Sequence, residues 1–500
     1  MPVSRACAIL LLGLLTAVAR AADVEPDGTT ALHTAVYAGD VAEVRRLIAD
    51  GADAKAANVF GATPMMLAAA RGDAAVIGAL LDAGVSADSP NAEGQTALMA
   101  VARTGSVDAA RLLLRRGADV HAREHWGGQT ALMWAAAQRQ PAMVRLLISK
   151  GARVNERATV RDWQRRVTAE GRPKDMNRGG LTPLLYAARE SCIDCLRALL
   201  ARGADIDLAD PDGSTALVIA LLNRNWDAGK FLIEAGADVN LWDIYGQTPL
   251  YVAVDMNTLP VGRRIELPAM DQATGEDIVR LLLAKGANPN AQLKLRPKYR
   301  NIPNDRYRDP MLVWGTTSLL RAAKAGDVPL LRLLLQHGAL ANLANSQGVT
   351  PLMAAAGDGG AHDPTRGRVR TEEDALECYR LLRAAGADVN ARTVLGIADG
   401  DLKVLTAANR TALHAAAARG WNKLIERLVA DGAQLDVVDS NGLSPIDYAL
   451  GRYPKEFNAL SPEPYPATVA LLRGFGARAE NPGATFPPGT TPSIKAIVPL

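Results

Sequence analysis

The chain has 500 residues, of which 48% are hydrophobic and 4% aromatic, and its 56 Lys and Arg side chains nearly balance 53 Asp and Glu side chains. A net charge of only +3 excludes the strong basic excess that is typical of a nucleic-acid-binding protein. The dominance of Ala, Leu and Gly favours closely packed short helices over a strand-rich core.

Residues 1–21 have the pattern of a secretory signal peptide. Arg5 precedes an apolar stretch from Ala8 to Val18, and small residues around Ala21 suit cleavage after that residue. The stretch is shorter than the ~20 residues that a membrane-spanning helix needs. We therefore expect an exported protein, periplasmic or secreted, without stable membrane insertion.

A threonine followed by a small or Pro residue and then Leu recurs along the rest of the chain. Of the ten steps between successive motifs, six are 33 residues long, one is 34, and three contain insertions. A regular period of this length indicates a stack of repeated structural units. The eleven motif positions are Thr30, Thr63, Thr96, Thr130, Thr182, Thr215, Thr248, Thr317, Thr350, Thr411 and Ser444.

One unit, Gly94–Val120, shows the physical role of each part of the repeat. Thr96 can cap a first helix by accepting a backbone N–H bond. Gly105 allows the turn, and the leucines at 112–114 drive a second helix into the core. Gly117 then ends that helix in the left-handed conformation.

The period and the motifs "TALHTA" at Thr30, "TPLMAA" at Thr350 and "TALHAA" at Thr411 resemble the ankyrin repeat. The resemblance implies an all-α ankyrin-repeat solenoid of about eleven helix-turn-helix units with hairpin fingers and several loop insertions. It also implies loop hydrogen bonds from the motif histidine, which only His33 and His414 can supply.

The interruptions of the period divide the chain. Three insertions follow the "GA-x-x-N" element and are expected to enlarge fingers, whereas three others fall between the two helices of a unit. The expected parts are a signal peptide at 1–21, repeats 1–4 at 22–155, a finger insertion at 156–179, repeats 5–7 at 180–290 with an insertion at 255–274, a basic finger insertion at 291–313, repeats 8–9 at 314–390 with an insertion at 357–373, a finger insertion at 391–409, repeats 10–11 at 410–478 with an insertion at 452–465, and a Pro- and Gly-rich tail at 479–500.

The first two finger insertions are basic and contain aromatic residues, and further aromatic residues lie in neighbouring fingers. Arg with Trp or Tyr is the composition of binding hot spots. Alternatively, the insertions are solvated loops whose aromatic residues only hold them against the repeats. The candidate partner-binding residues are Trp126, Arg161, Trp163, Arg165, Arg166, Trp242, Tyr245, Arg296, Tyr299, Arg300, Tyr307, Arg308 and Trp314.

The candidate catalytic and metal motifs do not fit their positions in the repeat. "HAREH", His121 to His125, matches a zinc-peptidase pattern but falls in a finger, where both imidazoles no longer lie on one helix face. Cys195 and Cys378 occupy a core position of their units, and Cys192 begins a second helix. The Cys192/Cys195 pair could be two unpaired thiols, a local disulfide or a redox pair.

These observations predict a non-catalytic scaffold or accessory protein without a cofactor. It would bind a protein partner, rather than nucleic acid, through the concave face and enlarged fingers of the solenoid. Two alternatives stay open: a thiol-disulfide redox protein that uses Cys192 and Cys195, and a binder of an acidic polymer or anionic surface through the Arg-rich fingers.

Overall fold

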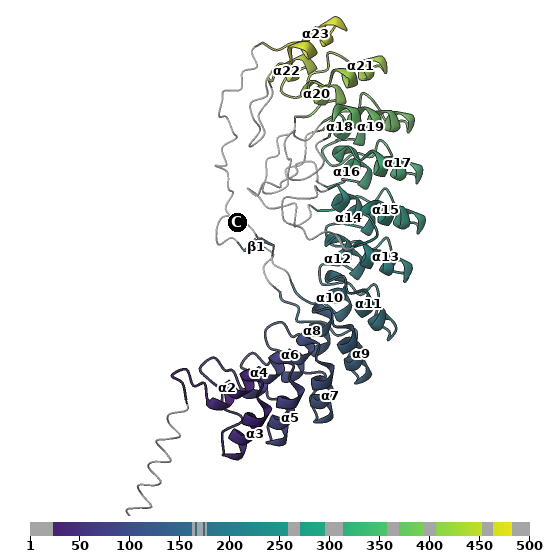
Figure 1. The fold of residues 1–500 in the computed structure, drawn as a ribbon. Helices are drawn as coiled ribbons and strands as arrows, with labels where there is room; N and C mark the ends of the chain where they lie inside the picture. The colour runs from purple at the N-terminus through teal and green to yellow at the C-terminus, as the bar shows by residue number, and fades with distance from the viewer. Residues whose placement is uncertain are drawn as a thin grey trace, which may run out of the picture. The chain divides into compact units, whose positions relative to one another are not determined.

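The computed structural model describes residues 24–162, 178–258, 271–295, 314–357, 370–394, 407–452 and 464–482, together with the backbone of two short strands between 163 and 177. It contains 22 helices in these residues, labelled α2 to α23 (Figure 1). They form eleven antiparallel pairs, so the expected all-α solenoid of about eleven units is confirmed. The chain divides into an N-terminal unit, Met1–Asp162 with Arg178–Pro211, and a C-terminal unit, Trp163–Asn177 with Asp212–Leu500.

The N-terminal unit contains the first five helix pairs. In each pair the first helix lies beside the loops that join neighbouring pairs, and the second helix lies on the far side (Figure 1). The helices are α2 (Ala31–Ala38), α3 (Val41–Ala49), α4 (Pro64–Arg71), α5 (Ala74–Asp82), α6 (Ala97–Thr104), α7 (Val107–Arg115), α8 (Ala131–Ala137), α9 (Pro141–Ser149), α10 (Pro183–Arg189) and α11 (Ile193–Leu200).

The C-terminal unit contains the other six pairs and the two strands. β1 (Arg166–Val167) and β2 (Lys174–Asp175) pair antiparallel, with Arg166 opposite Asp175. The helices are α12 (Ala216–Leu222), α13 (Trp226–Glu234), α14 (Pro249–Asn257), α15 (Gly275–Ala284), α16 (Ser318–Ala325), α17 (Val328–Gln336), α18 (Pro351–Ala355), α19 (Glu372–Ala384), α20 (Ala412–Ala417), α21 (Asn422–Ala430), α22 (Pro445–Ala449) and α23 (Pro466–Gly474).

The first helix of every pair begins after the repeated Thr or Ser. In ten of the eleven, the hydroxyl accepts a backbone N–H from the first turn, as Thr96 does from Met99. These caps satisfy donors that have no partner inside the helix. Gly105 ends α6 at a φ of 81°, and Gly117 follows α7 at a φ of 91°. The expected roles of these residues are confirmed.

The core lies between the helices of successive pairs. The position eight residues before the glycine that ends each second helix is fully buried in Val76, Ala109, Cys195, Ile278 and Cys378. Small residues in the first helices, such as Ala100 and Ala102, allow neighbouring pairs to approach closely. The assignment of Cys195 and Cys378 to this core position is therefore confirmed.

Asparagine side chains connect consecutive pairs within each unit. Asn155 donates to the carbonyl of Gly203 at 3.1 Å and accepts the N–H of Asp205 at 2.9 Å. Asn240, Asn290, Asn342 and Asn390 make the same two bonds to the next pair in the C-terminal unit. Because each amide is used as both donor and acceptor, it fixes the spacing and orientation of two neighbouring pairs.

The motif histidines make the loop hydrogen bonds that the resemblance implies. Nε2 of His33 contacts the carbonyl of Ala62 at 3.0 Å, and Nε2 of His414 contacts that of Leu443 at 3.3 Å. Each bond joins a first helix to the loop that precedes the next pair. Both histidines are 1% exposed, so they are structural.

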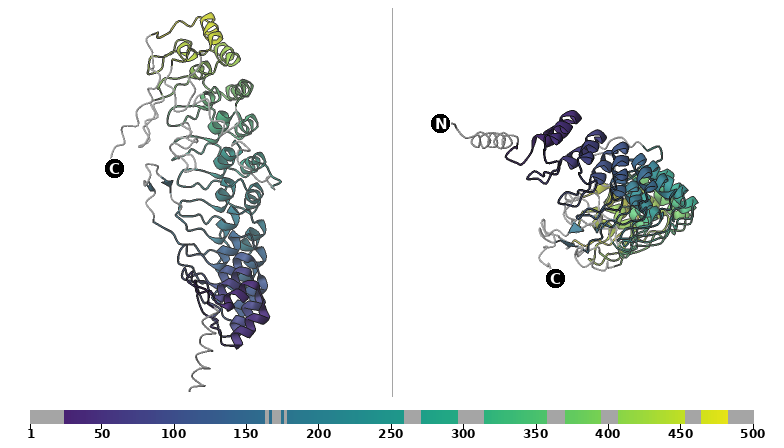
Figure 2. Two further views of the ribbon diagram at one scale, coloured as in Figure 1. Left: turned by 60° about the vertical axis from the view of Figure 1, so that its left-hand side comes forward. Right: turned by 90° about the horizontal axis from the view of Figure 1, so that it is seen from below.

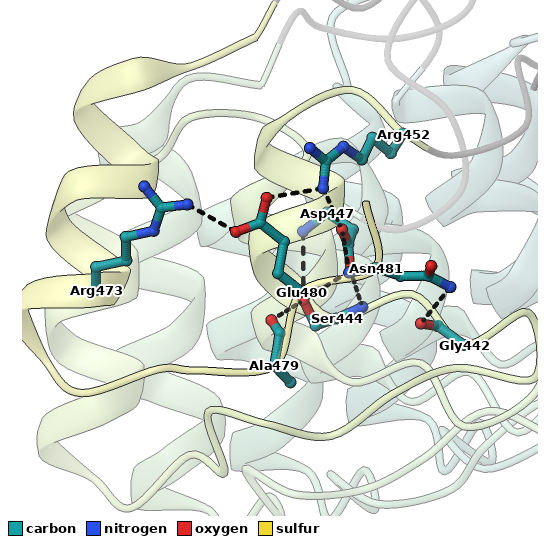
Figure 3. A network of polar contacts seen from close by, with 8 residues as sticks. All are labelled: Gly442, Ser444, Asp447, Arg452, Arg473, Ala479, Glu480 and Asn481. Atoms are coloured by element: carbon teal, nitrogen blue, oxygen red, sulfur yellow. Dashed lines mark hydrogen bonds and ion pairs between the residues drawn. The ribbon is translucent and has the colours of Figure 1, made fainter. Parts of the chain in front are cut away.

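A polar network closes the C-terminal end of the stack (Figure 3). Asp447 of α22 is fully buried and accepts hydrogen bonds from Ser444, Arg452 and the backbone of Asn481. Glu480 joins Arg452 to Arg473 of α23. Residues just after the last helix therefore fold back and satisfy the buried carboxylate, which explains an acid at a position that is normally apolar.

Candidate functional site

The loops between helix pairs form stiff fingers. Figure 2 shows them leaving the helix pairs on one side within each unit. In many of them one side chain at the start accepts backbone N–H groups of its own loop: Oδ1 of Asp243, for example, accepts from Tyr245 at 2.9 Å and from Gln247 at 3.0 Å. The same arrangement is built on Asn58, Asn345 and Asp439.

Backbone hydrogen bonds also join each finger to its neighbour. The N–H of His125 donates to the carbonyl of Glu93 at 2.8 Å, and the N–H of Ser346 donates to that of Trp314 at 2.8 Å. Because these bonds fix the backbone of the finger tips, side chains at the tips are presented in a set geometry. A partner that binds them loses little chain entropy in ordering the fingers.

Trp126 is the most exposed tryptophan at a finger tip of the N-terminal unit. Its side chain is 75% exposed, and the guanidinium of Arg161 lies over its ring at 4.5 Å. The same guanidinium donates to the carbonyl of Trp126. The structure thus brings two predicted partner-binding residues together from neighbouring fingers, with an aromatic surface open to solvent.

Trp242 has a corresponding position in the C-terminal unit. It is 50% exposed, and Nζ of Lys294, from the next finger, lies 3.1 Å from the centre of its ring. Both this contact and that of Arg161 are cation–π interactions, which hold a long cationic side chain over an aromatic face. Two separate fingers therefore present the same combination of an exposed tryptophan and a cation.

Two other predicted residues take structural roles. Tyr245 is only 8% exposed, and its carbonyl accepts the N–H groups of Lys294 and Leu295. It therefore packs the finger and does not present its ring to a partner, which corrects the expectation for this residue. Trp314 is half-buried and uses its carbonyl to hold the next finger.

The remaining predicted residues are not placed by the structure. The backbone of Arg166 belongs to β1, but its side chain lies outside the described part of the chain. The others outside the described residues are Trp163, Arg165, Arg296, Tyr299, Arg300, Tyr307 and Arg308.

Val59 and Phe60 were not predicted, and Lys294 was predicted only as one of the basic residues of the insertion at 291–313. Val59 and Phe60 form a finger tip of the N-terminal unit and are 70% and 79% exposed. Their exposure could have been expected from the repeat, since they stand two units before His125 and Trp126. The contact of Lys294 with Trp242 joins residues 52 positions apart and had no local signal.

The "HAREH" segment does not form a catalytic centre. Glu124 is 7% exposed, and its carboxylate accepts the N–H groups of Trp126, Gly127 and Gln129. A carboxylate that is occupied in this way shapes the finger and is not available as a general base. Within the described ranges, no group of three or more His, Cys, Asp or Glu side chains is placed to hold a metal ion.

Cys192 and Cys195 are joined by a disulfide, with their Cα atoms 5.2 Å apart. Of the three alternatives considered for this pair, the structure therefore has the local disulfide. Cys192 is the N-cap of α11, and the two residues are 6% and 0% exposed. Such burial favours a structural bridge over one that exchanges with other thiols.

No helix in the described ranges has both the length and the apolar character that crossing a bilayer requires.

Comparison with known proteins identifies the repeat. A family model described as ankyrin repeats (3 copies) matches residues 5–91, 65–158, 184–293 and 272–393. A second, described as ankyrin repeats (many copies), matches residues 413–453. Together they span well over half of the chain.

Curated relatives share the repeats over part of their length. The chain is 30% identical over 202 residues to the nuclear factor NF-kappa-B p105 subunit of Gallus gallus, covering 31% of this chain and 19% of that protein. It is 28% identical over 193 residues to the B-cell lymphoma 3 protein homolog of Mus musculus, covering 38% of this chain and 35% of the relative. A solved structure of the ankyrin repeat domain of Bcl-3 is 26% identical, with a TM-score of 0.38, and covers 51% of this chain and 99% of that one.

Proposed function

Because the chain belongs to the ankyrin-repeat family, we propose that it is a non-catalytic scaffold that binds a protein partner through its fingers and the first helices beside them. The two exposed tryptophans, each held under a cation from the neighbouring finger, carry this proposal. Tryptophan and arginine are the residues most enriched in binding hot spots. Indole surface that the fold leaves open to solvent is available for a partner to bury.

Pre-ordered geometry supports the same function. The backbone bonds between fingers and the asparagine contacts between pairs hold the binding side chains before a partner arrives. Burying one indole face removes apolar surface from water, and ordering costs are small because the fingers are already fixed. Affinity would therefore come mainly from the aromatic faces, with the cations setting orientation.

The proposed setting is outside the cytoplasm. The pattern of residues 1–21 supports it, and so does the disulfide between Cys192 and Cys195, since such bonds persist in oxidising compartments. The N-terminal sequence of the protein purified from its native host tests this setting. A start at Ala22 is expected, and a mature chain that retains residues 1–21 would contradict it.

Affinity capture with finger variants tests the proposed function. The double variant Trp126→Ala/Trp242→Ala and a variant without residues 291–313 are compared with the wild type as baits. We expect both to lose partners that the wild type retains. The matched control is Phe475→Ala, which removes an aromatic side chain that is 40% exposed beyond the last helix.

The outcomes separate the alternatives. If the double variant retained every partner bound by the wild type, the finger surface would not be the binding site. If capture by the wild type disappeared in moderate salt, the binding of an acidic polymer or anionic surface would be favoured, because an interface built on indole faces is weakly sensitive to salt. Loss of capture after reduction of the disulfide alone would favour the redox alternative.

A further inference from the structure

The first helices of the N-terminal unit share an unusual charge distribution. The five helices α2, α4, α6, α8 and α10 contain no Asp or Glu, but three of their exposed or half-exposed positions are arginine: Arg71, Arg103 and Arg189. A fourth, Arg139, follows α8 in the turn to α9. Pairs two to five therefore each supply one arginine near the end of the first helix, seven to nine residues after the capping threonine, and we call these four residues the arginine row.

Aromatic rings lie beneath three members of the row. The guanidinium of Arg71 lies 5.9 Å from the ring centre of Tyr37, and that of Arg103 lies 5.9 Å from the ring of Trp134. Arg189 lies 5.0 Å from the ring of Tyr186. Stacking on an aromatic face restricts a guanidinium while leaving the N–H groups at its edge available for a carboxylate.

Carboxylates do not neutralise most of the row. Among the described residues, Arg71, Arg103 and Arg139 make no ion pair, whereas Arg189 contacts Glu190 at 2.8 Å. Asp40 and Asp73, in the adjoining turns, cap α3 and α5 through backbone N–H groups.

The second helices contain both paired and unpaired arginines. Several of their arginines contact a nearby acid, as Arg46 does Glu43, Arg116 does Asp82 and Arg197 does Asp194. Arg45, Arg115 and Arg145 of the second helices also make no ion pair among the described residues, so the row is distinguished by the aromatic rings beneath three of its members.

Arg139 has a strained backbone conformation. Its φ is 57°, in the left-handed region, where the corresponding residues are Gly72 and Gly105 in pairs two and three but Ser191 and Arg224 in pairs five and six. Arginine in this conformation costs free energy that glycine does not. A strained residue that the fold would replace at a gain is a reason to look for function.

The spacing of the row suits an extended chain. Neighbouring helices pack about 8–10 Å apart, so the helix ends that supply the row recur roughly every 10 Å within the unit. A peptide in the extended polyproline II conformation advances about 3.1 Å per residue and has three residues per turn, so every third side chain lies on the same face. Every third residue of a peptide lying across the first helices would therefore meet an arginine.

We propose that the arginine row binds an extended acidic segment of a partner protein, with carboxylates about three residues apart meeting Arg71, Arg103 and Arg139 in turn. The exposed ring of Tyr37, 68% accessible, receives an apolar side chain at the end of the segment. Carboxylates accept two parallel N–H bonds from a guanidinium, which gives register as well as affinity. This inference rests on the proposed function and names the chemistry of the partner.

A protein segment fits better than a nucleic acid or a membrane. The chain as a whole carries a net charge of only +3, which supplies no broad field for a phosphate backbone. The row is also a single line of charges with aromatic rings beneath them. Such a line matches discrete carboxylates on one face of an extended chain.

Fluorescence anisotropy with a synthetic peptide tests the inference on the full-length mature protein. The probe is a labelled peptide of about 13 residues with a glutamate at every third position and small or apolar residues between. We expect it to bind at least about tenfold more tightly than a peptide of the same composition whose glutamates are adjacent. The double variant Arg71→Glu/Arg103→Glu should weaken binding of the spaced peptide by about 100-fold or more.

A matched control separates site from overall charge. Arg45→Glu/Arg115→Glu makes the same charge change at exposed positions of α3 and α7 and should change affinity by less than about threefold. Arg139→Gly is the sharper variant, because it should raise the urea midpoint of unfolding and at the same time weaken binding of the peptide. A merely structural role for Arg139 would leave peptide affinity unchanged.

The inference fails if spaced and adjacent glutamates bind equally, or if both double variants weaken binding equally. It also fails if single-stranded oligothymidylate or phosphatidylglycerol vesicles bind more tightly than the peptide and lose binding in Arg71→Glu/Arg103→Glu. Should the finger variants lose captured partners while Arg71→Glu/Arg103→Glu retains them, the proposed function would stand and this inference alone would be wrong.

Discussion

Asp255 and Arg321 form an ion pair inside the C-terminal unit. Nε of Arg321 in α16 donates to Oδ1 of Asp255 in α14 at 2.5 Å, and the two side chains are 3% and 0% exposed. Other first helices have an exposed residue at the position of Asp255, such as Tyr37 or Arg103. Since both groups are removed from water, each depends on the other to offset its desolvation.

Asp255→Asn should therefore lower the free energy of unfolding by about 3 kcal/mol or more, because it leaves the Arg321 charge buried without a counterion. The double variant Asp255→Leu/Arg321→Leu should recover most of that loss. Urea unfolding followed by circular dichroism measures both. Equal stability of the single and double variants would contradict a coupled pair.

The exposed pair Arg280 and Glu276 provides the control, with side chains 61% and 43% exposed. Glu276→Gln should change the free energy of unfolding by less than about 1 kcal/mol, because water screens this contact.

His414 makes stability depend on pH. The N–H of Thr411 donates to Nδ1 at 3.1 Å, so Nε2 carries the proton and donates to Leu443. Burial lowers the pKa of His414 from 6.5 to about 4. His414 binds a proton more readily in the unfolded chain than in the folded one. The stability that the neutral His414 contributes is therefore fully present above pH 6.5 and is lost as the pH falls toward 4.

We expect the wild type to lose about 3 kcal/mol between these pH values through His414. His414→Gln should remove that component of the pH dependence, although it lowers stability at neutral pH. Urea midpoints measured at half-unit pH intervals test the difference between the two proteins. A wild type and a variant with parallel pH profiles would exclude the histidine as the cause.

The repeat architecture could be predicted because its signals are local. Thr96 and Gly105 act within one helix and its turn, so a 33-residue period of such residues predicts helix pairs directly. Burial of Cys195 and Cys378 followed from the same register. No tertiary information was required for these assignments.

The candidate site could be predicted only in part. The exposure of Trp126 and Trp242 followed from their place at finger tips, but the burial of Tyr245 depends on how its finger folds against the next one. The stacking of Arg103 on Trp134 joins two units and has no signal in either alone. Contacts between repeats, which form the proposed binding surfaces, are therefore the part that required the structure.

Asp447 holds the C-terminal end of the stack. Burial would raise the pKa of its carboxyl, but hydrogen bonds from the backbone of Ser444 and Asn481 and from Arg452 outweigh it and lower the pKa. Asp447→Ala should lower the stability of the last pair by about 2–3 kcal/mol, since several donors lose their acceptor. Hydrogen exchange of the amides in α22 and α23 measures this loss directly.

The pH dependence of this end has a definite sign. A depressed carboxyl pKa contributes stability that is present above about pH 4 and is lost as the pH falls below it. The protection factors of the amides in α22, which are corrected for the intrinsic exchange rate at each pH, should therefore fall in acid for the wild type and change less in Asp447→Ala. Glu480→Gln is the control, because Glu480 lies nearer the surface and its loss should cost less than about 1 kcal/mol. Faster exchange in Glu480→Gln than in Asp447→Ala would show that Asp447 is not the residue that stabilises this end of the stack.

Thiol titration tests the disulfide between Cys192 and Cys195. The chain has four cysteines, so a protein that starts at Ala22 lacks Cys7 and should contain one free thiol, Cys378. Burial raises the pKa of Cys378 to about 12, and the folded protein should therefore react with no equivalent of a thiol reagent. In urea alone one thiol per chain should react, and in urea after reduction three thiols per chain should react.

The bridge itself should contribute little to folding. It closes a loop with a sequence separation of only three residues, for which the chain-entropy estimate is no more than about 2 kcal/mol. Cys192→Ser/Cys195→Ser should accordingly fold and retain its partners in affinity capture. Three equivalents released by urea without reductant would show that the pair is reduced in solution, and loss of partner binding in the double variant would assign the bridge a role beyond the fold.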